Sequence, residues 1–174
     1  MGDADRNFVI QQGLEPAAAD ACTVLTSALL FQPRIIGAWV LLGCLLRSGW
    51  VFAALSAVLW WNVLVPSLNP FELIYNRFLA GRSGRPALGP APAPRRFSQG
   101  MGGTFAAAMA AALFTGSRGA AIGIGIAFLF AVGVLVFGRL CFGSFIYHLL
   151  HGRVAFAVRT LPWGRGTGMP AVKS

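Results

Sequence analysis

The sequence predicts an all-α integral membrane protein, in which two transmembrane helical hairpins are each followed by an amphipathic interfacial helix. Three observations support this prediction. Hydrophobic residues make up 56% of the 174 residues and charged residues only 11%, a composition far from that of a water-soluble globule. Apolar runs of helical length are bounded by Gly, Pro or Arg, and basic residues gather between and after these runs. The whole chain is therefore expected to form a single membrane domain.

Four apolar runs are expected to cross the membrane, since about 20 helical residues span about 30 Å of hydrocarbon. These runs cover residues 35–46, 50–65, 101–115 and 120–137. Very short turns at 47–49 and 116–119 join them into two hairpins. The expected segments are an N-terminus (1–16), a first hairpin with flanking interfacial helices (17–80), a Pro/Gly/Arg-rich connector (81–96), a second hairpin with its interfacial helix (97–153) and a basic tail (154–174).

The start of the first span leaves two alternatives open. Residues 17–31 form either an interfacial helix or an extension of the span with a kink at Pro33. Arg34 then marks either the cytoplasmic end of the span or a charge within the membrane that needs a partner. The number of membrane helices is accordingly four or five.

The two halves of the chain read as a diverged parallel repeat. RNFVIQQG (6–13) and RFSQG (96–100) precede the hairpins, and NPFELIYNRFLAGR (69–82) and CFGSFIYHLLHGR (141–153) follow them. Both later segments carry apolar residues at helical spacing, which is typical of an amphipathic helix at a membrane interface. The connector between the halves is expected to be extended and solvated.

The charges predict the orientation. After residue 20 the chain carries one acid, Glu72, against thirteen basic residues. Arg47 and Arg118 lie in the hairpin turns, whereas five basic residues lie between the two hairpins (Arg77, Arg82, Arg85, Arg95 and Arg96) and five follow the second hairpin (Arg139, Arg153, Arg159, Arg165 and Lys173). The positive-inside rule then places both termini and the connector in the cytoplasm. Because the basic residues occupy short loops, we expect contact with membrane lipids and not with nucleic acid.

Small residues on the fourth span predict close helix packing. Gly119, Gly123, Ala127 and Ala131 recur at every fourth position, a register that lets helix backbones approach closely in lipid. Other integral membrane subunits are the expected partners.

Few residues offer chemistry. His148 and His151 lie three positions apart on one predicted helix, a spacing compatible with haem or chlorin ligation, although the sequence requires no cofactor. No metal site is predicted, because no acidic partner lies nearby. A lone carboxylate outside the N-terminal region also leaves no pair for acid–base catalysis, so we expect no enzyme and no catalytic residues.

The features follow a definite order along the chain: an RFxQ-like motif, a hairpin, an NPF-type segment, a basic connector, a second RFxQ-like motif, a second hairpin and a Cys-x-Gly-x run. This order resembles that of an uncharacterised bacterial four-helix membrane family, a domain of unknown function. The likeness covers residues 6–152. It implies a final Cys-x-Gly-Cys motif and thiol or sulfur handling, with Cys141 as the redox candidate, in the bacterial cytoplasmic membrane. Here the motif is Cys141-Phe142-Gly143-Ser144, so no disulfide can form within it.

Together these features favour a non-catalytic accessory or structural subunit that packs against a larger membrane complex, whether respiratory, photosynthetic or for biogenesis. Two alternatives remain. One is a thiol-redox or sulfur-relay component that uses Cys141. The other is a haem- or pigment-binding protein that uses His148 or His151.

Overall fold

The computed structural model describes residues 3–15, 19–81 and 85–164, and helices are the only regular elements within these ranges. In chain order the elements are α1 (Asp3–Gln11), α2 (Ala19–Leu29), α3 (Phe31–Leu46), α4 (Gly49–Leu64), the 3-10 turn η1 (Pro66–Leu68), α5 (Pro70–Phe78), α6 (Ala93–Phe114), α7 (Arg118–Gly138), α8 (Phe142–Leu150) and α9 (Val154–Arg159). The predicted all-α class is confirmed for these residues.

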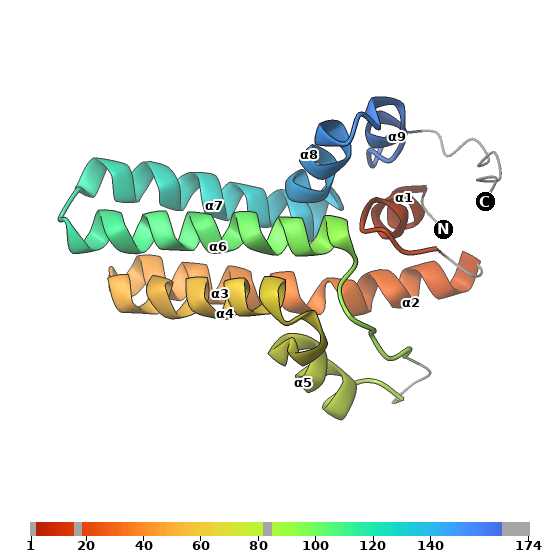
Figure 1. The fold of residues 1–174 in the computed structure, drawn as a ribbon, viewed down its shortest axis with the longest axis horizontal. Helices are drawn as coiled ribbons and strands as arrows, with labels where there is room; N and C mark the ends of the chain where they lie inside the picture. The colour runs from red at the N-terminus through yellow and green to blue at the C-terminus, as the bar shows by residue number, and fades with distance from the viewer. Residues whose placement is uncertain (1–2, 16–18, 82–84, 165–174) are drawn as a thin grey trace.

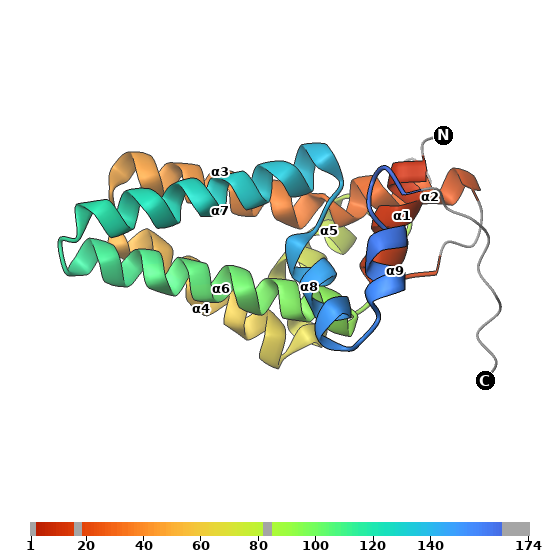
Figure 2. The same ribbon diagram turned by 90° about the horizontal axis from the view of Figure 1, so that it is seen from above.

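Four long helices form a bundle. In Figures 1 and 2, α3, α4, α6 and α7 run side by side along the long axis, and both hairpin turns lie at one end. Helices α1, α8 and α9 gather at the opposite end, and α5 lies beside the bundle near that end. Two helices, Cys22–Leu46 (α2 and α3 taken together) and Arg118–Gly138, are long and apolar enough to cross a membrane by length and composition.

Helix α2 runs almost directly into α3, the first helix of the bundle. The backbone N–H of Leu30 donates to Thr26 and that of Arg34 donates to Leu30, at 3.0 and 3.1 Å, so helical hydrogen bonds run through the boundary. Pro33 has no N–H to offer the carbonyl of Leu29, which explains the interruption there. Of the two alternatives, the structure shows the extension, and Arg34 is exposed in the first turn of α3.

The connector is shorter and more ordered than predicted. Helix α6 begins at Ala93, not near residue 101, because Pro94 in its first turn has no N–H to leave unpaired. Within the described part of the connector, Leu88 is buried and both of its backbone polar groups bond to the Asn76 side chain at 2.8 Å. Residues 85–87, 89 and 90 are exposed and outside any helix, as expected of a solvated connector. The expectation is wrong for Leu88, Ala91, Pro94 and Arg95, which are buried.

The helices of the bundle pack through close backbone approaches. Helix α4 lies against α6, where the Ser56 hydroxyl donates to the Gly103 carbonyl at 2.9 Å. A Cβ atom at Gly103 would lie 2.9 Å from the Trp60 ring, so only glycine fits there without a shift of that ring. The core between the helices consists of apolar side chains, including Val40, Phe52 and Phe128.

The predicted packing face of α7 does not face the bundle. Gly119, Gly123 and Ala127 are exposed, and nothing lies within 4 Å of a Cβ built on either glycine. The buried residues of α7 are Ala121, Gly125 and Phe128, which lie on nearly the opposite side of the helix. Ala131 is half-buried. Contact of the exposed face with another chain stays a prediction.

Helix α1 contacts later parts of the described chain. The Asn7 amide donates to the carbonyls of Leu161 and Gly164, both at 2.9 Å, and Arg139 pairs with Asp5 at 3.1 Å. The expected N-terminal segment thus contains α1, and the expected tail begins with α9. The basic residues Arg82, Arg165 and Lys173 lie outside the described residues.

Candidate functional site: a buried polar cluster and a thiol-lined cavity

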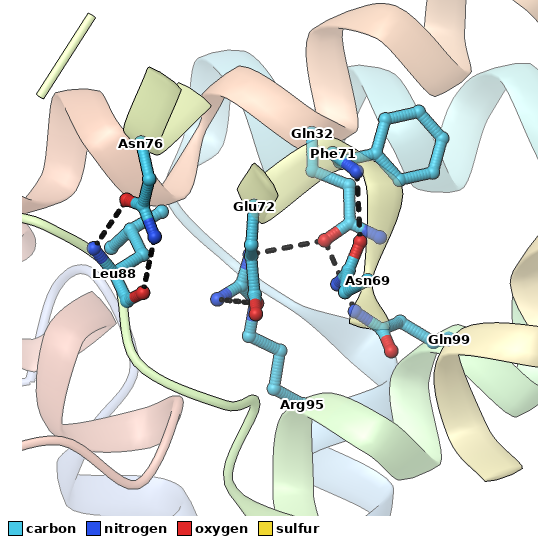
Figure 3. A network of polar contacts seen from close by, with 8 residues as sticks. All are labelled: Gln32, Asn69, Phe71, Glu72, Asn76, Leu88, Arg95 and Gln99. Carbon is cyan, nitrogen blue, oxygen red and sulfur yellow. Dashed lines mark hydrogen bonds and ion pairs between the residues drawn. The ribbon is translucent and has the colours of Figure 1, made fainter. Parts of the chain in front are cut away.

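A buried ion pair lies where α5 meets α6. Glu72 and Arg95 are joined at 2.9 Å, and their side chains are only 6% and 7% exposed. Figure 3 shows the pair within a wider network that includes Gln32 of α3 and Gln99 of α6. Burial raises the pKa of Glu72, and the charge of Arg95 opposes this shift. The prediction that Arg95 is a solvated connector charge is therefore wrong.

Gln32 connects α3 to Arg95 and Gln99 of α6. Its side-chain oxygen accepts one hydrogen bond from Arg95 and one from Gln99, each at 3.0 Å. Nearby, Asn69 caps α5 by accepting from the backbone N–H of Phe71 at 3.0 Å, as an N-cap residue should. These contacts hold α5 and the starts of α3 and α6 together.

A second polar cluster surrounds Cys141, which caps the N-terminus of α8. Its thiol donates to the Ser98 hydroxyl oxygen at 3.2 Å, and its backbone N–H donates to the Gln11 side-chain oxygen at 3.0 Å. The Ser98 hydroxyl lies 2.9 Å from the Pro94 carbonyl and 3.1 Å from the Ser144 hydroxyl. Residues from α1, α6 and α8 therefore fix the thiol in position.

Gly143 permits this contact between α8 and α6. A Cβ atom at Gly143 would lie 2.6 Å from the Ser98 Cα atom, closer than any real Cβ contact with backbone. The Cys-x-Gly-Ser motif thus has a structural explanation in this chain. Its cysteine and serine both contact Ser98, and its glycine lets the two helices meet.

The two clusters border one cavity of about 130 Å³. Its polar lining comes from Gln12, Gln32, Arg95, Ser98, Gln99 and Cys141, and its apolar lining from α3, α4, α6 and α7. Cys141 is only 4% exposed, so its side chain is shielded from bulk solvent and borders this cavity. A reagent that modifies the thiol is expected to arrive through the cavity.

The structure separates the two histidines. His148 is buried, and its Nε2 lies 3.1 Å from the Gln11 carbonyl. His151 is exposed, and its Nδ1 lies 2.8 Å from the Tyr147 carbonyl. Among the described residues no three His, Cys, Asp or Glu side chains form a group that could hold a metal. This arrangement lends no support to a haem or metal shared by the two rings.

Sequence reasoning identified Cys141 but missed most of the residues around it. Gln99 belongs to a repeated RFxQ-like motif, and Gln11 lies in the matching N-terminal segment, so the motif itself was the available signal. Nothing in the local sequence distinguishes Arg95 from Arg96, which is only half-buried, because the burial of Arg95 depends on where α5 is placed.

Comparison with known proteins gives one match. Residues 18–151 match the family described as "Domain of unknown function (DUF4395)". No curated protein matches the chain, and no solved structure matches it. The matched range includes all four bundle helices and most of the residues of both polar clusters. It covers well over half of the chain, which therefore belongs to the DUF4395 family.

Proposed function

We propose that this chain is an integral membrane subunit that supplies one thiol, Cys141, to a thiol or sulfur relay completed by a partner protein. The observation that carries this proposal is the position of Cys141, whose thiol is held by Ser98 at 3.2 Å on the wall of a largely apolar cavity. The thiol therefore borders a space that a reactant could enter.

The relay needs a second protein because the chain offers no resolving thiol in the motif. Ser144 occupies the position three residues after Cys141. In the simplest exchange, the Cys141 thiolate attacks a disulfide R–S–S–R′, forms the Cys141–S–S–R bond and releases R′–S⁻. A partner thiolate then attacks the sulfur of R, takes R away as a new disulfide and releases the Cys141 thiolate.

The membrane setting of this proposal follows from the composition and the two long apolar helices. The positive-inside rule favours the cytoplasmic side for α5 and α8, since Arg77, Arg85, Arg139 and Arg153 lie at that end of the bundle. Cys141 would then serve a partner on the cytoplasmic face of a bacterial membrane.

Trapping the mixed disulfide tests the proposal. Membranes are quenched with acid, alkylated, and separated with and without reductant, followed by peptide mass spectrometry. We expect a reductant-sensitive adduct at Cys141 that persists in a Cys44→Ser variant and disappears in a Cys141→Ser variant. If the Cys141→Ser variant keeps the same adducts and the same growth as the wild type, the relay proposal is wrong.

The exposed face of α7 supports a second candidate, an accessory subunit with a purely structural role. Gly119 and Gly123 leave open space along this face, which suits the close approach of a helix from another subunit. On a native gel after mild solubilisation, we expect a large complex that a Gly123→Leu variant weakens and an Ile126→Leu variant preserves. Migration only as a monomer or homodimer would contradict this candidate.

A further inference from the structure

A groove lies on the outer side of the bundle between α4 and α6, two helices that run side by side in Figure 2. Its volume is about 400 Å³, and its surface is almost wholly apolar. Helix α4 contributes Trp60 and Val63, and α6 contributes the face between Arg96 and Phe105. Trp60 and Thr104 are exposed, so the groove opens away from the core. Its lining includes none of the polar residues of the thiol-lined cavity.

The shape of the groove suits an alkyl chain. It follows α6 from Arg96 to Thr104, about 12 Å at 1.5 Å per residue. Gly100 keeps its floor open, since a Cβ atom there would lie 3.6 Å from the Val63 Cγ2 atom and would fill part of the space. The Thr104 hydroxyl donates to the Gly100 carbonyl at 2.9 Å. A carbon chain can therefore lie along this stretch without covering an unpaired hydroxyl.

One end of the groove carries a cation that has no counter-ion among the described residues. Arg96 is half-buried there. The two carboxylates that form ion pairs in the described part of the chain bind Arg95 and Arg139 instead. Only the Nε atom of the Arg96 guanidinium is both buried and without a hydrogen bond. The two terminal nitrogens stay accessible, and as donors they suit the oxygens of a phosphate group, which an Arg side chain can bind through two parallel hydrogen bonds.

The groove is oriented as a lipid would be in a membrane. Arg96 lies in the first turn of α6, at the end of the bundle opposite the hairpin turns, and the groove runs from there toward those turns (Figure 1). Beside Arg96, the Phe97 ring lies 5.8 Å from the ring of Tyr147 in α8, and aromatic rings of this kind are typical of the headgroup level. Basic residues at that level attract the anionic lipids of the cytoplasmic leaflet.

We propose that this groove binds one anionic phospholipid, whose phosphate accepts hydrogen bonds from the terminal nitrogens of Arg96 and whose acyl chain lies along Gly100 and Thr104. The occupant is a lipid and not a free phosphate ion, because a free ion would gain only one partly exposed ion pair, which is weak. The site goes beyond the thiol relay, since Cys141 lies outside the groove. It does rest on the membrane setting proposed above.

Lipid binding measured by native mass spectrometry tests the role of the charge. The protein in dodecyl maltoside is titrated with phosphatidylglycerol or with phosphatidylcholine of the same acyl chains. Phosphatidylglycerol should bind about fivefold more tightly, the effect of one basic residue beside an anionic headgroup. Arg96→Gln should remove this preference. Arg34→Gln, at an exposed position in the first turn of α3, should keep it.

Equal binding of the two lipids by the wild type, or a preference that survives Arg96→Gln, would overturn the proposal. Displacement of phosphatidylglycerol by an excess of inorganic phosphate would also overturn it, because the site would then recognise the ion alone. A Cys141→Ser variant should bind both lipids as the wild type does. Failure of the thiol relay and failure of the lipid site can therefore be told apart.

Photo-crosslinking tests where the chain lies. Phosphatidylglycerol with a diazirine on one acyl chain is added to the protein in phosphatidylcholine nanodiscs, and the labelled peptides are identified by mass spectrometry. Label should concentrate on residues 60–63 and 97–105. Thr104→Phe fills the groove and should remove most of this label, whereas Ala108→Phe, exposed one turn further along α6 and outside the groove, should retain it. Label spread evenly over the exposed face of α7, or label that survives Thr104→Phe, would contradict the proposal.

Discussion

The thiol of Cys141 lies 3.2 Å from the hydroxyl oxygen of Ser98, although 43 residues separate the two in the chain. Cys141 caps α8 and Ser98 lies in α6, so this contact measures how closely the two helices meet. Two predictions concern this junction, a third concerns His148 of α8, and a fourth concerns the ion pair between Glu72 and Arg95.

Gly143→Ala should separate α8 from α6. The added Cβ would lie 2.6 Å from the Ser98 Cα atom, and overpacking of this kind typically costs about 1–3 kcal/mol. We expect a lower unfolding midpoint and faster alkylation of Cys141. Gly133→Ala is the control, since a Cβ at Gly133 meets nothing within 4 Å. Equal midpoints for the two variants would show that the helices do not meet as described.

Ser144→Cys should create a reversible disulfide with Cys141. The Cys141 thiol and the Ser144 hydroxyl both contact the Ser98 hydroxyl, at 3.2 and 3.1 Å, so the two side chains point toward the same place. Mild oxidation should remove both thiols from reaction with maleimide, and reductant should restore them. Phe145→Cys, one residue further along, should stay reduced under the same conditions. Similar oxidation of the two variants would contradict this placement of the Cys141 and Ser144 side chains.

The stability of the protein should fall as the pH decreases below about 6.5, because burial lowers the pKa of His148 from its ordinary value of 6.5. Arg153 and His151 lower this pKa further, and the hydrogen bond to Gln11 opposes the shift. Between the two pKa values the unfolded chain binds more protons than the folded one, so acid favours unfolding. Unfolding midpoints from pH 8 to pH 5.5 measure the effect. His148→Gln should flatten this dependence, and His151→Gln at the exposed position should preserve it.

Glu72→Gln should destabilise the protein by about 3–5 kcal/mol, since it leaves the buried Arg95 without its counter-ion. The double variant Glu72→Gln with Arg95→Met should recover much of this loss, because it removes the uncompensated charge. Chemical unfolding of the wild type, both single variants and the double variant forms the complete cycle. Additive effects would show that the two side chains do not interact.

The sequence by itself determined the features that depend on local pattern. Apolar runs of helical length predicted the four bundle helices, and short Gly- and Ser-containing turns predicted their pairing into hairpins. The repeated segments after the hairpins predicted α5 and α8. Each of these properties follows from composition and spacing within about twenty residues of the chain.

Only the tertiary structure decided which polar residues are buried. Arg95 lies in a basic, proline-rich stretch that predicts solvent exposure, yet it is buried because α5 places Glu72 against it. Gln11, Ser98 and Cys141 come from three separated segments and meet only when α1 and α8 close the end of the bundle. A buried polar group needs a partner wherever the chain can supply one, and here the partners lie 23 to 130 residues apart along the chain. The site is thus a product of how the helices pack, and the RFxQ-like and Cys-x-Gly-Ser motifs mark only some of its residues.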